Sequence, residues 1–238
     1  MSRRRPPVVV GIDLAGSPHR PTGLCLLCGV RAATSVAFSD GEILDLVKRA
    51  RPALVPIDAP LSLPRGPRSI HSRSGEHLRD CDRELLRLRI RFFPITLGPM
   101  RMLTARGLAL KKKLAALGYR TVECYPGAAQ DVWGLPRQHR NLTGLLTGLR
   151  KLGLRGLKKT ATSDELDAAT AALVGQRSLL GLGTMLGGQG GILIPAVKGK
   201  NAKHSSPDRV HARSFVLRGK ARAHLPLLAT RPCKTVGL

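Results

Sequence analysis

Acidic residues are scarce in this sequence. The 238 residues include only 15 Asp and Glu against 40 Lys and Arg, so the formal net charge is +25. This imbalance favours a polyanion as the partner, and we expect nucleic acid rather than an anionic membrane surface. A genome biased towards Arg, Ala, Gly and Pro is the alternative explanation of the charge.

Aromatic residues, cysteines and long apolar runs are also few. Aromatics make up 3% of the chain, which leaves little material for the base-stacking platforms of single-strand binders. No stretch approaches the ~20 apolar residues of a membrane span. The five cysteines are an odd number, and the Arg-rich start precedes only a short apolar stretch that contains Asp13. We therefore expect a reduced, cytoplasmic protein with no membrane span.

The stretch 8–16, Val-Val-Val-Gly-Ile-Asp-Leu-Ala-Gly, organises the rest of the chain. Its β-branched run predicts a buried strand, and Gly11 and Gly16 let another part of the chain or a ligand approach the end of that strand. Asp13 lies at this end, where an unpaired carboxylate is costly to bury. It therefore needs a metal ion, a basic side chain or backbone N–H groups as a partner.

The pattern of apolar runs and turns predicts one α/β domain over residues 1–198. The first three strands follow one another closely enough to form an antiparallel meander, and helices then alternate with further strands. The strands after the first are expected at 22–30, 32–38, 53–57, 119–124 and 192–195. Residues 199–238 contain nine basic residues and one acidic residue, which predicts a disordered basic tail with nonspecific affinity for nucleic acid.

Two motifs have a structural explanation that competes with a chemical one. Cys25 and Cys28 lie three apart in a predicted strand, so their side chains point to opposite faces and packing is favoured over metal or redox chemistry. The charged helix expected at 77–91 includes Arg79 and Asp82. A solvated, ion-paired face explains its charges as well as contacts with phosphate would.

The clearest helix signal covers residues 162–174. Thr162 and Glu165 fit a capping box, which marks the start of the helix. Asp164 and Asp167 lie three apart and share one side of its first turn. The apolar face is expected to comprise Leu166, Ala169, Leu173 and Val174.

Five of the fifteen acids occupy positions where desolvation is expensive: Asp13, Asp58 and Glu123 at strand ends, and Asp164 and Asp167 at the start of the helix. Taken alone, Asp164 could offset the helix dipole and Asp58 could cap the turn at Ala59 and Pro60. In an open α/β sheet, however, strand ends and helix starts converge at one edge. Oxygen ligands of this kind suit Mg²⁺ or Mn²⁺, and two such ions ~4 Å apart can promote phosphodiester hydrolysis.

The chain also resembles a known family through five motifs in the same order. These motifs are Gly11-Ile12-Asp13, Ile57-Asp58-Ala59-Pro60-Leu61, Cys81-Asp82-Arg83-Glu84-Leu85, Glu123-Cys124-Tyr125-Pro126 and Asp164-Glu165-Leu166-Asp167-Ala168. They are similar to a prokaryotic domain family described as predicted RNase H-like nucleases, over about residues 8–195. The resemblance implies an RNase H-like mixed sheet, with a three-strand antiparallel meander, alternating helices and strands, and helical insertions after Asp58 and Glu123.

The resemblance further implies a metal-dependent nuclease that uses Mg²⁺ or Mn²⁺ and acts on RNA, DNA or a hybrid. Asp13, then Asp58 or Glu123, then Asp164 and Asp167 are the implied catalytic residues and metal ligands. Two alternatives remain open. One is a noncatalytic nucleic-acid-binding protein of the same fold, and the other is an actin-like phosphotransferase, whose phosphate loops also begin Gly-Ile-Asp-x-x-Gly but generally require a duplicated core.

Overall fold

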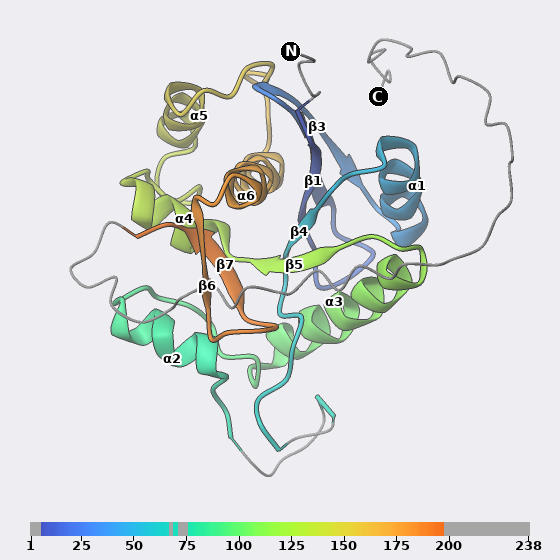
Figure 1. Cartoon of the computed structure of the whole chain (residues 1–238), viewed down its shortest axis with the longest axis vertical. Helices are drawn as coiled ribbons and strands as arrows, with labels where there is room; N and C mark the ends of the chain where they lie inside the picture. The colour runs from blue at the N-terminus through green and yellow to red at the C-terminus, as the bar shows by residue number, and fades with distance from the viewer. Residues whose placement is uncertain (1–5, 67–68, 71–75, 198–238) are drawn as a thin grey trace, which may run out of the picture. The chain divides into compact units, whose positions relative to one another are not determined.

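The computed structural model describes residues 6–66, 69–70 and 76–197. They form a mixed seven-stranded sheet with six helices (Figure 1). The strands are β1 (Val8–Asp13), β2 (Thr22–Cys28), β3 (Arg31–Ala37), β4 (Val55–Asp58), β5 (Thr121–Cys124), β6 (Gly183–Leu186) and β7 (Ile192–Pro195). The helices are α1 (Asp40–Ala50), α2 (Asp80–Arg87), α3 (Gly98–Ala116), α4 (Pro126–Trp133), α5 (Leu142–Lys151) and α6 (Ser163–Leu179).

The strand order is β3-β2-β1-β4-β5-β7-β6. Strands β1, β2 and β3 form the expected antiparallel meander, and β4, β5 and β7 continue the sheet in parallel. This arrangement confirms the predicted RNase H-like α/β fold. Strand β6 is an addition that the sequence did not predict, because its four residues lie among glycines and carry no clear alternation. The tail expected at 199–238 lies outside the described residues and stays a prediction.

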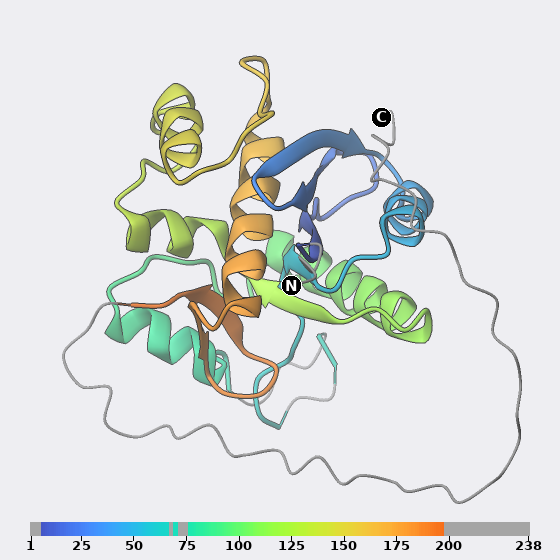
Figure 2. The same cartoon turned by 45° about the horizontal axis from the view of Figure 1, so that its top comes forward.

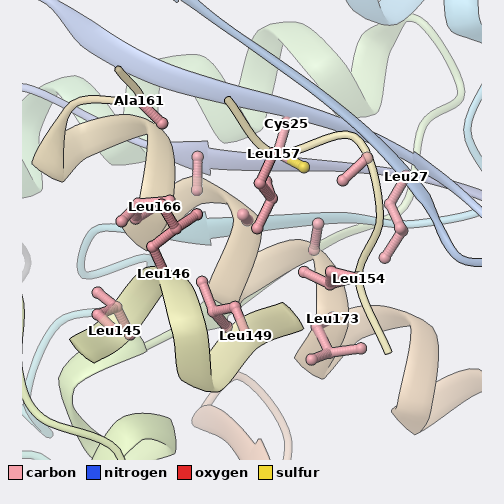
Figure 3. Close-up of a cluster of buried hydrophobic side chains, with 14 of the residues drawn as sticks. Cys25, Leu27, Leu145, Leu146, Leu149, Leu154, Leu157, Ala161, Leu166 and Leu173 are labelled. Atoms are coloured by element: carbon pink, nitrogen blue, oxygen red, sulfur yellow. The ribbon is translucent and has the colours of Figure 1, made fainter. Parts of the chain in front are cut away.

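The two faces of the sheet pack against different helices (Figures 1 and 2). Because side chains alternate along a strand, β1 directs Val10 and Ile12 into a core with α1 and α3. Its Val9 joins the opposite core, which is formed with α5 and α6. Figure 3 shows this second core, where Cys25 lies among leucines. Burial raises the pKa of the Cys25 thiol to about 12, so the expected packing role of this cysteine is confirmed.

Helix α6 is the central helix of the domain. Its N-terminus carries the predicted capping box, in which the Thr162 hydroxyl accepts from Glu165 N–H at 3.2 Å and the Glu165 carboxylate accepts from Thr162 N–H at 2.8 Å. The four residues of the expected apolar face are all buried, and burial extends beyond them to every residue from 165 to 175. The four alanines among residues 168–172 allow this, since small side chains let strands and helices surround the helix.

Two glycines bring α6 unusually close to the sheet. A Cβ at Gly11 would overlap the carbonyl oxygen of Ala168, and a Cβ at Gly23 would overlap that of Asp164. The prediction that Gly11 admits a neighbouring chain segment is therefore confirmed, and that segment is α6. Gly23 lies directly opposite Asp13 in the β1–β2 ladder, so its missing side chain also lets the start of α6 reach Asp13.

We expect Gly23→Ala to lower the free energy of unfolding by about 2 kcal/mol or more, because the added methyl group meets backbone that cannot rotate away. Gly41→Ala is the matched control. Gly41 is exposed in α1 with only the Ser39 hydroxyl nearby, at 3.7 Å, and alanine favours helix. Urea unfolding of both variants is the measurement, and equal stability of Gly23→Ala and wild type would contradict the close approach.

Helix α2 is shorter than the helix expected at 77–91. It covers only Asp80–Arg87. The chain reverses at Arg89, whose φ of 58° is left-handed, and Ile90 N–H donates to the Leu85 carbonyl at 2.9 Å across this turn. The sequence did not signal this end, because such a turn normally carries glycine or asparagine.

Candidate active site

Asp13 and Asp58 end two neighbouring parallel strands. They are direct partners in the register between β1 and β4, so their side chains leave the same face of the sheet. This is the face that carries Gly11 and therefore the face covered by α6. Both residues are half-buried. Within the part of the chain that the structure describes, neither carboxylate has a hydrogen bond or an ion pair.

Helix α6 supplies Asp164 and Asp167 to the same place. Asp164 lies in its first turn, against Gly23 and therefore beside Asp13. Asp167 is buried, and Gln130 of α4 donates from Nε2 to its Oδ1 at 2.6 Å. Gln130 is itself fully buried, so it holds the Asp167 carboxylate in one orientation. No signal in the sequence marked this glutamine.

The four aspartates repel one another. The pKa of Asp13 is raised well above its usual range by burial and by the charges of Asp58, Asp167 and Asp164, and the exposed Arg20 only partly opposes this. Burial and the charge of Asp167 likewise raise the pKa of Asp58. Burial raises the pKa of Asp167 to about 6, against the hydrogen bond from Gln130. The site thus concentrates negative charge that the protein leaves largely uncompensated.

Glu123 has a different environment. It is the register partner of Ile57, one residue before Asp58, so its side chain leaves the opposite face of the sheet. There its Oε2 accepts from Arg79 Nη1 and from Leu61 N–H, both at 2.7 Å. Its charge still raises the pKa of Asp58. The structure therefore brings four of the five predicted carboxylates together and gives the fifth a basic partner.

Arg79 is a site residue whose role the sequence did not reveal. Besides Glu123, it binds Asp82 twice, with Nη2 to Oδ1 at 2.9 Å and Nε to Oδ2 at 3.1 Å. Arg79 and Asp82 are therefore ion-paired as expected, but their exposed fractions are 5% and 1%, so the expectation that they lie on a solvated face is wrong for these two residues. One signal in the sequence could have indicated that Asp82 is buried. It lies next to Cys81 and one turn before Leu85, and both of these residues are buried.

The donor set suits a hard divalent cation. All four clustered side chains are carboxylates, which are the ligands that Mg²⁺ and Mn²⁺ prefer. Among residues 6–66, 69–70 and 76–197, no three His, Cys, Asp or Glu side chains already stand at the spacing of a coordination shell. The cluster thus offers the ligand type that these ions prefer, without a preformed coordination shell.

Comparison with known proteins gives a family and a set of solved structures. A chain of RuvC from Thermus thermophilus in complex with a Holliday junction substrate is 16% identical, and the match covers 73% of this chain and 96% of that chain with a TM-score of 0.46. A second Thermus thermophilus RuvC structure has the same identity and coverage with a TM-score of 0.41. The search of curated proteins found no match. Among the described residues, no helix is long and apolar enough to cross a bilayer. A family model described as "Protein of unknown function (DUF429)" matches residues 11–189. The chain belongs to this family.

Proposed function

We propose that this protein is a nuclease that hydrolyses phosphodiester bonds of nucleic acid with the help of Mg²⁺ or Mn²⁺. The observation that carries the proposal is the cluster of Asp13, Asp58, Asp164 and Asp167. Asp13 and Asp58 lack any partner among the described residues, and burial together with the charges of the neighbouring acids raises the pKa of both. A folded protein retains such repulsion only where a cation offsets it or where function requires it.

In the proposed mechanism, each residue has a role that follows from its surroundings. Asp13 and Asp58 would hold the cation from the sheet, and Asp164 and Asp167 would hold it from α6. Gln130 keeps the Asp167 carboxylate turned towards the site through its 2.6 Å hydrogen bond. Bound divalent cations would supply an activated water and stabilise the leaving oxygen.

Glu123 acts on the site from the opposite face of the sheet. Arg79 and Leu61 N–H hold one of its oxygens, and its negative charge acts on Asp58 across the sheet. We propose that Glu123 strengthens the attraction of the cluster for a cation and that Arg79 positions Glu123. The charge of the whole chain, +25, gathers the polyanionic substrate.

The test combines cleavage with metal binding. We expect cleavage of at least one of single-stranded RNA, single-stranded DNA, duplex, hybrid or branched substrate with Mg²⁺ or Mn²⁺, and none with EDTA, because the carboxylates alone cannot stabilise a leaving phosphate oxygen. We also expect either ion to raise Tm, because it binds the folded protein and removes repulsion among the aspartates. Labelled substrates on denaturing gels and differential scanning fluorimetry are the measurements.

Two outcomes would count against a nuclease. Tight, salt-sensitive binding with no cleavage across all substrates and metals would favour the noncatalytic nucleic-acid-binding alternative. A Tm that neither Mg²⁺ nor Mn²⁺ changes would show that the aspartates do not form a metal site.

A further inference from the structure

A groove beside the site collects aromatic and basic side chains. It lies between the segment 89–94, which follows α2, and α4 with the segment 137–140 after it, and its volume is about 920 Å³. Cys81 and Leu85 of α2 and Ala128 of α4 belong to one buried hydrophobic cluster, to which Phe92 and Tyr125 also pack. We call this groove the aromatic groove, and the residues that define it are Phe92, Phe93, Tyr125, Arg89, Arg91 and Arg140.

Aromatic residues are rare in the chain but not in this groove. The sequence has four Phe, two Tyr and one Trp, and three of these seven line it. Phe93 is 72% exposed, the largest exposed fraction among the large hydrophobic side chains of the described residues. The fold gains little from a phenylalanine that it leaves in water, so the ring is available to a ligand.

Tyr125, a second aromatic residue of the groove, is held in place by hydrogen bonds. The Tyr125 hydroxyl donates to the Arg91 carbonyl at 2.7 Å and accepts from Arg137 Nη1 at 2.9 Å. The Arg137 guanidinium also lies 5.5 Å from the centre of the Tyr125 ring. An ordered aromatic ring next to an exposed one is typical of surfaces on which bases stack.

The charge of the groove complements phosphate. Its one acid, Asp131, is bound by Arg137 through contacts of 2.6 and 3.1 Å. The side chains of Arg89, Arg91 and Arg140 have no acidic partner within the described residues, and all three are exposed. Three unpaired guanidinium groups along one groove match the spaced negative charges of a nucleic-acid backbone.

The aromatic groove adjoins a smaller cleft that reaches Asp58, one of the four clustered aspartates. Phe92, Phe93 and Tyr125 also line this cleft, whose volume is about 200 Å³ and which also reaches Glu123. A nucleic-acid strand that extends from the groove into this cleft would therefore approach Asp58.

We propose that the aromatic groove binds an unpaired, single-stranded segment of the nucleic-acid substrate. Phosphates contact Arg89, Arg91 and Arg140, and an unstacked base lies against Phe93. A base inside a duplex has both faces covered by its neighbours, so only an unpaired segment offers a free face to this ring. The inference rests on the proposed nuclease function, because it names the part of the substrate that the groove presents to the carboxylates.

The experiment measures binding without catalysis. Full-length Phe93→Ala and wild type are titrated in EDTA against a labelled single-stranded oligonucleotide and against the corresponding duplex, by fluorescence anisotropy. We expect Phe93→Ala to weaken single-strand binding at least about five-fold and to change duplex binding less than two-fold. Phe38→Ala is the matched control, because Phe38 is also exposed, at 54%, but lies outside the groove at the end of β3.

A charge variant tests the second part of the inference. Arg89→Gln is expected to reduce the slope of log K against log salt by about 0.7 for single strands, which is the value for one lost phosphate contact. Equal single-strand affinities of Phe93→Ala and Phe38→Ala would overturn the proposal. An equal loss of duplex affinity in Phe93→Ala would also overturn it and assign the groove to duplex. Because no metal is present, a failure to cleave leaves this result intact and counts only against the nuclease.

Discussion

Asp13→Asn is expected to lower the rate of metal-dependent cleavage about a thousand-fold, which corresponds to about 4 kcal/mol of transition-state stabilisation. Asn has the same shape but lacks the charge that holds a divalent cation. Asp13 is the best residue for this test because the charges of Asp58, Asp167 and Asp164 all raise its pKa. The measurement is the single-turnover rate with Mg²⁺ or Mn²⁺ on whichever substrate the wild type cleaves.

The same variant should be more stable than wild type when no metal is present. The pKa of Asp13 is raised in the folded protein, so the folded state binds this proton more tightly than the unfolded state. Wild-type stability therefore falls as pH rises from about 4 through the folded pKa. Asn removes this penalty. We expect Asp13→Asn to raise Tm in EDTA at pH 8, with the difference shrinking towards pH 4.

Asp45→Asn serves as the control for both measurements. Asp45 lies in α1 with a side chain that is 61% exposed, and among the described residues its only ion pair is with Lys48 at 3.6 Å. It should leave cleavage and Tm nearly unchanged. Cleavage by Asp13→Asn at the wild-type rate would remove Asp13 from the site. Equal Mg²⁺-induced rises in Tm for Asp13→Asn and wild type would place the metal elsewhere.

Arg79→Met should lower the free energy of unfolding by about 3–5 kcal/mol, the range for removing one partner of a buried ion pair. Methionine fills the space of the aliphatic part of the Arg79 side chain. It leaves Glu123 and Asp82 buried without their positively charged partner. Burial raises the pKa of Glu123 and Arg79 opposes this, so without Arg79 the pKa of Glu123 should rise further and the loss should be larger at pH 8 than at pH 5. Urea unfolding at the two pH values is the measurement.

Two further variants separate the buried network from ordinary surface pairing. Arg65→Met breaks the ion pair between Arg65 and Asp80, whose side chains are 80% and 41% exposed respectively. It should change the free energy of unfolding by less than about 1 kcal/mol. Adding Glu123→Gln to Arg79→Met removes one orphaned charge and should restore part of the loss. An Arg79→Met protein as stable as Arg65→Met would show that the buried network contributes nothing to the fold.

The main lines of the fold could be predicted from the sequence because they depend on local signals. The β-branched run of β1 and the Thr162–Glu165 capping box specify a strand and a helix start from a few neighbouring residues. Strand β6 and the end of α2 could not be predicted in the same way. The first lacks alternation, and the second places an arginine, Arg89, in a left-handed turn.

Candidate residues of the site were also visible in the sequence, since an acid directly after an apolar strand is conspicuous by itself. Asp13, Asp58, Asp164 and Asp167 lie together because strand ends and the start of α6 meet at one edge of the sheet. Gln130 and Arg79 were not foreseen. Each acts through a residue 37 or 44 positions away, and no local pattern encodes such a pairing.

The sequence by itself determined which carboxylates end strands or begin α6, because secondary structure and capping follow from neighbouring residues. Only the tertiary structure decided how these carboxylates are shared between two environments. Asp58 is in register with Asp13, whereas Glu123 is in register with Ile57. A shift of one residue turns a side chain to the other face of a sheet. The register between β4 and β5 therefore directs Glu123 to Arg79, and it is set by long-range packing that neither strand specifies alone.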